Sequence, residues 1–340
     1  MAAQELQEIA RAIVAEGKGI LAADESDSTI KKRFASIGVE STEENRRAYR
    51  DLLFTTEGVE EFISGVILFD ETIRQSSADG TPFPRLLESK GVIPGIKVDK
   101  GAKPLALADG ETITEGLDGL RGRLEEYREL GARFTKWRAV ITIGKGIPSE
   151  YCLWTNAHAL GRYAALSQEV GLVPIVEPEV LMDGDHTIER SFEVTSRTLH
   201  AVFTELRDQR IQHEGMLLKP NMVLSGYDCP VQASHEEVAA ETIRCFRRHV
   251  PAAVPGIVFL SGGQSDEDAT ANLNAINALG EHPWQLSFSY GRALQAPALK
   301  AWGGENVEAA QRAYHHRAKM NSAARTGMYA PEMEKEAVPA

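Results

Sequence analysis

Short apolar runs alternate with longer segments in which apolar residues recur at helical spacing. There are eight such runs, which contain or end in polar residues: GILAAD, SGVILFD, IPGIKVD, FTKWRAVI, VPIVEPEV, GMLLKPN, GIVFLSGG and WQLSFSYGR. Because they are apolar on both faces and separated by helical segments, they indicate parallel strands buried beneath helices. Eight strand–helix units are the number that closes a TIM (β/α)8 barrel, a fold of the α/β class. A doubly wound open sheet is the alternative.

The segments between the runs carry the start and stop signals of helices. Ser234 and Glu237 have the spacing of a capping box, in which each side chain bonds the other residue's backbone N–H. In another segment, apolar residues at helical spacing end before Gly131: Leu117, Leu120, Leu124 and Tyr127. These signals favour a chain in which helices follow strands.

The first residues are also predicted to form a helix. Their apolar side chains recur at intervals of three and four residues and form one stripe: Leu6, Ile9, Ala10, Ile13 and Val14. Glu5, Glu8 and Glu16 lie in this segment, which has no apolar run of signal-peptide length. We expect a surface helix here and no secretory leader.

Length and composition fit one domain. The 340 residues of the chain lie within the range of about 250 to 400 residues in which α/β barrels fold around one core. With 43% hydrophobic and 25% charged residues, the composition is that of an ordinary globular protein. We assign residues 1–330 to a single barrel domain. The last segment, PEMEKEAVPA at residues 331–340, is acidic, contains two prolines and is expected to form a mobile tail.

The charge balance and the cysteines limit the partners and the compartment. Lys and Arg number 37 against 49 Asp and Glu, and the net charge of -12 opposes binding to nucleic acid or to anionic membranes. No stretch reaches the roughly 18 apolar residues of a membrane-spanning helix. Cys152, Cys229 and Cys245 are far apart and match no disulfide framework, so we expect reduced thiols in the cytoplasm.

Charged residues stand where several strands are predicted to end, which in a barrel is the catalytic face. Asp24 closes the first strand. Lys136 and Arg138 are two residues apart in the fourth strand, as are Glu177 and Glu179 in the fifth, so each pair points to one side. Charges on apolar strands are costly to bury unless they meet opposite charges, and we expect these pairs to face one cavity. A purely structural layer of ion pairs is the alternative.

Lys219 ends the sixth strand, between Leu218 and Pro220. Burial and neighbouring positive charge both favour the neutral amine of a lysine, which is its nucleophilic form. A lone lysine more often extends from a strand end into solvent. The charged residues predicted around Lys219 favour a nucleophile in the same cavity.

Two further groups of residues have the composition of anion sites. LSGGQS after the seventh strand and YGR after the eighth place small and basic residues where many barrels bind phosphate: Ser261, Gly262, Gly263, Gly291 and Arg292. A glycine pair alone is more often a simple turn, so the signal lies in two such endings on adjacent strands. Ser26, Thr29 and Arg33 follow the first strand, where a helix N-cap explains the hydroxyls equally well.

The nine histidines and three cysteines lack the spacing of transition-metal ligands, so no metal site is predicted. His315 and His316 are expected on a solvent-exposed helix face.

Many motifs, in order from Gly17 to Gly304 and beyond, closely resemble those of the class I fructose-bisphosphate aldolases: GKGILAADES, EENRR, GVILFDET, GIKVDKG, KWR, PIVEPE, LLKPNM, FLSGGQS, LNAIN, FSYGRALQ and LKAWGG. The resemblance covers nearly the whole chain. It implies reversible cleavage of fructose 1,6-bisphosphate to dihydroxyacetone phosphate and glyceraldehyde 3-phosphate, with no metal or other cofactor. It also implies a homotetramer. The only partner that it implies besides further copies of the chain is a small sugar phosphate.

The resemblance implies roles for individual residues as well. Lys219 would form a Schiff base with the ketone, and Glu177 would transfer protons with Glu179 beside it. Lys136 and Asp24 would assist. The residues that would hold the substrate and its phosphates are Ser26, Thr29, Arg33, Lys97, Ser261, Gly262, Gly291 and Arg292, and Arg138 and Gly263 are counted with them. A protonated imine withdraws electrons more strongly than a carbonyl, so a carbon–carbon bond can break to leave an enamine.

Two departures from the family pattern and two alternatives stand beside this interpretation. The chain reads DST after AADES where many relatives have TGS or TGT, which places Asp27 near an expected phosphate. The tail lacks the terminal tyrosine of many eukaryotic members, so we expect it to take no part in the chemistry.

A transaldolase-like barrel would also use a Schiff-base lysine. A non-catalytic scaffold would be expected to lack a charged site residue, and none is missing.

Overall fold

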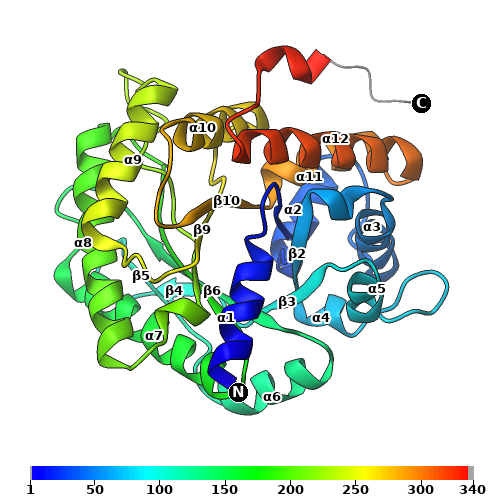
Figure 1. Ribbon diagram of the computed structural model, residues 1–340, viewed down its shortest axis with the longest axis horizontal. Coiled ribbons are helices and arrows are strands. Elements are labelled where there is room, and N and C mark those ends of the chain that lie inside the picture. Colours follow the sequence, from blue (N-terminus) through cyan, green and yellow to red (C-terminus); the bar gives the residue numbers. More distant parts are fainter. Residues whose placement is uncertain (1, 336–340) are drawn as a thin grey trace.

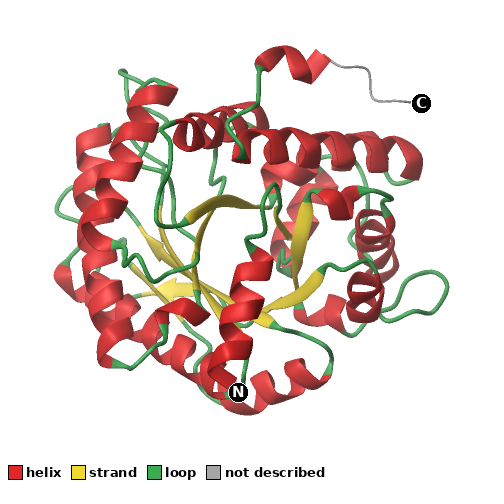
Figure 2. Cartoon of the chain, in the orientation of Figure 1, coloured by secondary structure: helices red, strands yellow, loops and turns green. Residues whose placement is uncertain are grey.

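Each of the eight apolar runs forms a strand of one closed parallel barrel in the computed structural model, which describes residues 2–335 (Figure 1, Figure 2). The TIM barrel prediction is therefore confirmed. The strands are β1 (Gly19–Ala22), β2 (Ile63–Leu68), β3 (Ile93–Lys97), β6 (Phe134–Ile141), β7 (Val173–Val180), β8 (Leu217–Leu218), β9 (Gly256–Phe259) and β10 (Gln285–Tyr290). β1 pairs with both β2 and β10, which closes the sheet.

Helices surround the barrel and connect its strands (Figure 2). The longer ones are α1 (Ala2–Ile13), α2 (Asp27–Ala35), α3 (Glu43–Thr55), α6 (Leu120–Glu129), α7 (Glu150–Glu169), α8 (Ile188–Asp208), α9 (His235–His249), α10 (Asp266–Ala278), α11 (Arg292–Trp302) and α12 (Val307–Arg325). Shorter ones are α4 (Asp70–Ile73), α5 (Phe83–Ser89) and the 3-10 turns η1 (Val59–Glu61), η2 (His213–Gly215) and η3 (Pro331–Lys335). The predicted capping box of Ser234 and Glu237 begins α9. Within residues 2–335, no helix has the length and apolar character needed to cross a membrane.

Helix α1 covers the N-terminal end of the barrel, where it lies against the strand starts (Figure 1). Four residues of the predicted stripe are buried, and Ile9 is partly buried. They pack against side chains inside the barrel: Ile20, Ile67, Phe134, Val173, Ile175, Leu217 and Val258. A Cβ atom at Gly95 would lie 2.2 Å from the ring of Phe134. Glycine at this position therefore leaves room for the largest side chain of this inner cluster. The interior of the barrel beneath α1 is therefore filled with apolar side chains.

An antiparallel hairpin between β3 and β6 was not predicted. It consists of β4 (Ala102–Pro104) and β5 (Thr112–Thr114), which pair only with each other. Leu107 in the connecting turn is fully exposed and has a φ of 61°. A positive φ is uncommon for a residue other than glycine.

The start of the predicted tail is held against α12. Glu334 in η3 accepts hydrogen bonds from Arg317 and from the Tyr329 hydroxyl, the latter at 3.0 Å. Its other oxygen lies 3.2 Å from His316 Nε2. His315 packs on the ring of Phe62, with the ring centroids 5.3 Å apart. The two histidines are thus half-buried, and their expected solvent exposure was wrong. Residues 336–340 of the predicted tail lie outside the described residues.

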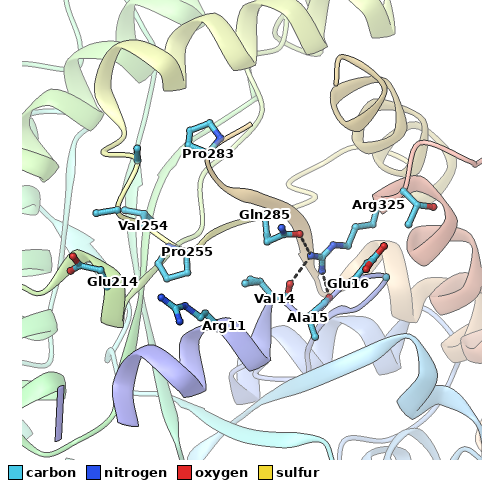
Figure 3. A pocket seen from close by; sticks show the side chains of 14 residues that line it. Arg11, Val14, Ala15, Glu16, Glu214, Val254, Pro255, Pro283, Gln285 and Arg325 are labelled. Carbon is cyan, nitrogen blue, oxygen red and sulfur yellow. Dashed lines mark hydrogen bonds between the residues drawn. The ribbon is translucent and has the colours of Figure 1, made fainter. Parts of the chain in front are cut away.

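Arg325, the last residue of α12, fastens the end of the chain to its beginning (Figure 3). Its guanidinium donates to the carbonyl oxygens of Val14 at 2.6 Å, Ala15 at 2.7 Å and Lys18, and to the side chain of Gln285 at 2.9 Å. Carbonyls at a helix end have no partner within the helix, so Arg325 satisfies the end of α1. Burial lowers the pKa of Arg325 to about 10, which leaves it protonated at neutral pH. These groups line a cavity of about 960 Å³ at the N-terminal end of the barrel.

The substitution Arg325→Met should therefore lower the free energy of unfolding by about 2 to 4 kcal/mol, because several buried carbonyl oxygens lose their donor. Urea denaturation followed by circular dichroism measures the effect. Arg312→Met is the matched control, since Arg312 lies on the same helix, is exposed and has only a 3.7 Å ion pair with Glu308. Equal stabilities of the two variants would contradict the assigned role.

Candidate active site

A cavity of about 560 Å³ opens at the C-terminal ends of the barrel strands. It is lined by fourteen of the fifteen predicted site residues: Asp24, Ser26, Thr29, Arg33, Lys97, Lys136, Arg138, Glu177, Glu179, Lys219, Ser261, Gly262, Gly291 and Arg292. The predicted charge pairs on β6 and β7 thus face one space, and Lys219 shares it. The exception is Gly263, which is not among the lining residues and lies against Tyr227.

Four buried side chains of alternating sign form a continuous charge row, which we define as Lys219, Glu177, Lys136 and Asp24. The Lys219 Nζ atom lies 3.1 Å from Glu177 Oε1. On the other side of the carboxylate, Glu177 Oε2 lies 3.3 Å from Lys136 Nζ, which in turn lies 2.6 Å from Asp24 Oδ2. Glu177 and Lys136 lie on β7 and β6, whereas Lys219 and Asp24 follow the ends of β8 and β1. None of the four side chains is more than 11% exposed.

The charge row fixes the protonation states of its carboxylates. Burial alone would raise the pKa of Glu177, but the positive charges of Lys136 and Lys219 outweigh it, and the pKa is lowered. Burial would also raise the pKa of Asp24. The positive charges of Lys136, Lys219 and Lys97 outweigh this effect, and the pKa falls well below its usual value. Lys136 is desolvated, yet Asp24 and Glu177 raise its pKa. At neutral pH Glu177 is therefore a carboxylate, able to accept a proton.

Glu177 has one oxygen that is poorly satisfied. Its Oε2 atom is buried and has no hydrogen-bond partner among the described residues, although Lys136 is within ion-pair distance. Buried acceptors in native proteins are seldom left without a donor. An acceptor of this kind, in a cavity wall beside an amine, is available to a hydroxyl group of a bound molecule.

A second layer of contacts holds the basic residues at the edge of the charge row. Arg138 donates from Nε to Glu179, and its backbone N–H donates to Asp99 at 3.2 Å. The other Asp99 oxygen lies 3.6 Å from Lys97 Nζ. Asp99 therefore connects Lys97 with β6. Sequence reasoning missed it, although Asp99 stands two residues after Lys97 and shares its side of an extended segment.

One basic group lies at the start of α2. The Ser26 hydroxyl is 3.1 Å from that of Thr29 and makes no capping bond to the helix, so the simple N-cap interpretation does not hold. Lys32 and Arg33 line the cavity beside them. Lys32 was missed, although it lies three residues after Thr29 and hence on the same helix face. Asp27 begins the helix but is exposed and is not among the cavity-lining residues.

The buried side chain of Glu25 holds Arg33 in position. Its carboxylate accepts hydrogen bonds from Arg33, from Arg50 Nη2 at 2.6 Å and from Gln295 Nε2 at 2.8 Å. Two arginines around one buried carboxylate leave a net positive charge, which faces the cavity through Arg33. Glu25 was not predicted, because its partners come from α3 and α11, far away in the sequence.

The second group of predicted phosphate-binding residues lies at the ends of β9 and β10. Gly262 has a φ of 56°, a value that favours glycine, and its carbonyl accepts a hydrogen bond from Arg292 Nη2 at 2.9 Å. Ser261 and Gly291 complete the group. The cavity lining thus includes Arg33 and Lys32 from α2 and Arg292 from α11 together with the charge row. Leu260, Ser289, Ala22 and Gly101 also line it and were not predicted.

No group of three or more His, Cys, Asp or Glu side chains within residues 2–335 is arranged to hold a metal ion. The residues of this cavity offer a lysine amine, carboxylates and basic groups that can bind anions. A buried amine beside a proton-accepting carboxylate can add to a carbonyl group.

Comparisons with known proteins identify the family of the chain. The family model "Fructose-bisphosphate aldolase class-I" matches residues 5–339. The "Probable fructose-bisphosphate aldolase class 1" of Xanthomonas campestris is 59% identical over 332 residues, which are 97% of this chain and 99% of that protein. "Fructose-bisphosphate aldolase 4, cytosolic" of Arabidopsis thaliana is 58% identical over 316 residues, which are 92% of this chain and 80% of that protein.

A solved structure has the same fold. The fructose-bisphosphate aldolase of Plasmodium falciparum, in complex with TRAP and a small-molecule inhibitor, superposes with a TM-score of 0.96 and is 52% identical. The match covers 97% of this chain and 96% of that one. On the family match, the relatives and the shared fold, the chain belongs to the class I fructose-bisphosphate aldolases, a family of lyases.

Proposed function

We propose that the protein cleaves fructose 1,6-bisphosphate to dihydroxyacetone phosphate and glyceraldehyde 3-phosphate, and that the same site joins them in reverse. The observation that carries this proposal is the position of Lys219. Its amine is buried in the cavity, 3.1 Å from the Glu177 carboxylate. A nucleophile and a proton-transferring group at this distance are what formation of a Schiff base requires.

In the first half of the reaction Lys219 attacks the ketone carbon of the open-chain sugar. A C=N bond replaces the C=O bond, and two of the three ammonium protons end on the departing oxygen, which leaves as water. Glu177 takes these protons from nitrogen and delivers them to oxygen. The product is a protonated imine that retains the positive charge of Lys219, so the alternation of the charge row is preserved.

In the second half the bond between C3 and C4 breaks. The C4 hydroxyl gives its proton to Glu177, and the aldehyde product leaves. The bonding electrons move toward the imine nitrogen, and an enamine forms. Protonation of C3 and hydrolysis of the imine then release dihydroxyacetone phosphate and restore Lys219. Glu179, held by Arg138, is the adjacent carboxylate.

The two basic regions account for a substrate with a phosphate at each end. Arg33 with Ser26 and Thr29 forms one, and Arg292 with the turn at residues 261–263 forms the other. Local positive charge is needed because the net charge of -12 repels anions from the protein as a whole. A transaldolase-like enzyme would not require two phosphate sites.

We also infer a homotetramer in the cytoplasm. Several large apolar side chains are exposed, among them Leu107 at the hairpin turn and Tyr151 and Trp154 on α7. Exposed aromatic and aliphatic side chains are enriched at subunit interfaces.

All three cysteines are buried and unpaired, which suits a reducing compartment. The Arabidopsis relative carries "cytosolic" in its name.

The purified protein should release both triose phosphates from fructose 1,6-bisphosphate in equal amounts, as coupled assays for each product would measure. EDTA should leave the rate unchanged, because the imine serves as the electron sink. The transaldolase-like alternative would be favoured if no dihydroxyacetone phosphate were released and the ketone fragment were transferred to an added aldose instead. Loss of the rate in EDTA, restored by zinc, would indicate a metal-dependent enzyme.

The substitution Glu177→Gln should reduce kcat by roughly 10²-fold or more, the scale of general acid–base catalysis, while substrate still binds. Steady-state kinetics and equilibrium binding of the substrate separate the two effects, with the fold checked by circular dichroism. Glu125→Gln on the exposed face of α6 is the control and should be silent. Near-normal turnover of Glu177→Gln would transfer the proton relay to Glu179.

A further inference from the structure

We propose that Tyr227 is a positioning residue that holds the glycine turn at residues 261–263 in the shape that binds a substrate phosphate. The inference rests on the proposed function, because it assigns this turn to phosphate. Tyr227 lies in the segment after β8, and the reaction scheme does not use it. Three segments that follow successive strands β7, β8 and β9 meet at its side chain.

The backbone of Tyr227 is fixed by the segment after β7. Its N–H donates to the Met182 carbonyl at 3.0 Å, and the N–H groups on either side, of Gly226 and Asp228, donate to His186 at 2.8 Å and Gly184 at 2.9 Å. Three consecutive hydrogen bonds leave this part of the chain little freedom. Tyr227 is therefore a fixed support, and its ring direction is set before any ligand arrives.

The side chain of Tyr227 packs against the back of the glycine turn. Its hydroxyl donates to the Met182 sulfur at 3.3 Å. A Cβ atom at Gly263 would lie 2.3 Å from the same hydroxyl oxygen, and one at Gly262 would lie 2.8 Å from the Met182 sulfur. The phenol and the thioether thus occupy the space that side chains at these two positions would need. The absence of side chains in the turn permits this close contact.

The turn has a second support on its opposite side. Arg292 donates to the Gly262 carbonyl at 2.9 Å, and Ser261 and Gly262 line the cavity. Glycines lose more conformational freedom on ordering than other residues, so an unsupported pair would move readily. Tyr227 and Arg292 hold the turn between them, which keeps its N–H groups in place for an anion. Holding binding groups in place before the ligand arrives lowers the entropic cost of binding.

The chemistry of the phenol suits this position. Burial raises the pKa of Tyr227 to about 12, although the Gly263 backbone amide and Arg292 act against the shift. The hydroxyl is therefore neutral at physiological pH, donates a hydrogen bond and adds no negative charge beside a phosphate. The residue remains 42% exposed, so its replacement does not open a cavity in the core.

The test compares Tyr227→Ala, which removes the support, with Tyr227→Phe, which keeps the ring. Tyr227→Ala should raise the KM for fructose 1,6-bisphosphate, and the inhibition constant of inorganic phosphate, by roughly fivefold or more, the effect of slightly misplaced binding groups. Its kcat and melting temperature should change little. Tyr227→Phe should restore most of the affinity. Val231→Ala, at an exposed position in the same segment after β8, is the control.

Two outcomes would overturn the proposal. One is an unchanged KM and phosphate inhibition in Tyr227→Ala. The other is a fall of kcat and melting temperature together at constant KM, which would mark a merely structural residue. Failure of the parent protein to cleave the sugar would instead refute the proposed function. Phosphate affinity, measured by calorimetry on the parent and on Tyr227→Ala, tests the positioning role independently of turnover.

Discussion

Burial of like and unlike charges at the mouth of one barrel is the constraint on which the rest of the structure depends. An isolated ion inside a protein is strongly destabilising, so buried charges persist only beside opposite ones. The charge row meets this requirement by alternating amine and carboxylate from Lys219 to Asp24. Each member compensates its neighbour, and loss of one would leave another unpaired.

The barrel provides this alternation through its register. β6 and β7 run side by side with Arg138 opposite Glu177 and Val140 opposite Glu179, so that side chains two residues apart on each strand enter the same space. At the other end, α1 and the ring of Phe134 fill the barrel with apolar groups. Apolar groups therefore lie between the charge row and the other end of the barrel, and they shield the charges from bulk water on that side.

The strands and most of the cavity could be predicted because both depend on local pattern. Apolar runs gave the strands, and polar residues at their ends gave the charge row. Contacts between distant segments could not be obtained this way. Glu25 and Gln295, for example, are 270 residues apart, and no spacing rule connects them. The hairpin near Leu107 has too short an apolar pattern to predict, and Gly263 was assigned to the cavity because the sequence does not show which side of a turn Tyr227 covers.

The central claim is that Lys219 is the residue that reacts with substrate. Sodium borohydride reduces an imine to a secondary amine, so treatment in the presence of dihydroxyacetone phosphate should fix the sugar irreversibly to the protein. Peptide mapping by mass spectrometry identifies the modified lysine. The account predicts a label on Lys219, with none on the neighbouring Lys136. A label on any other lysine, or no label in an active protein, would contradict it.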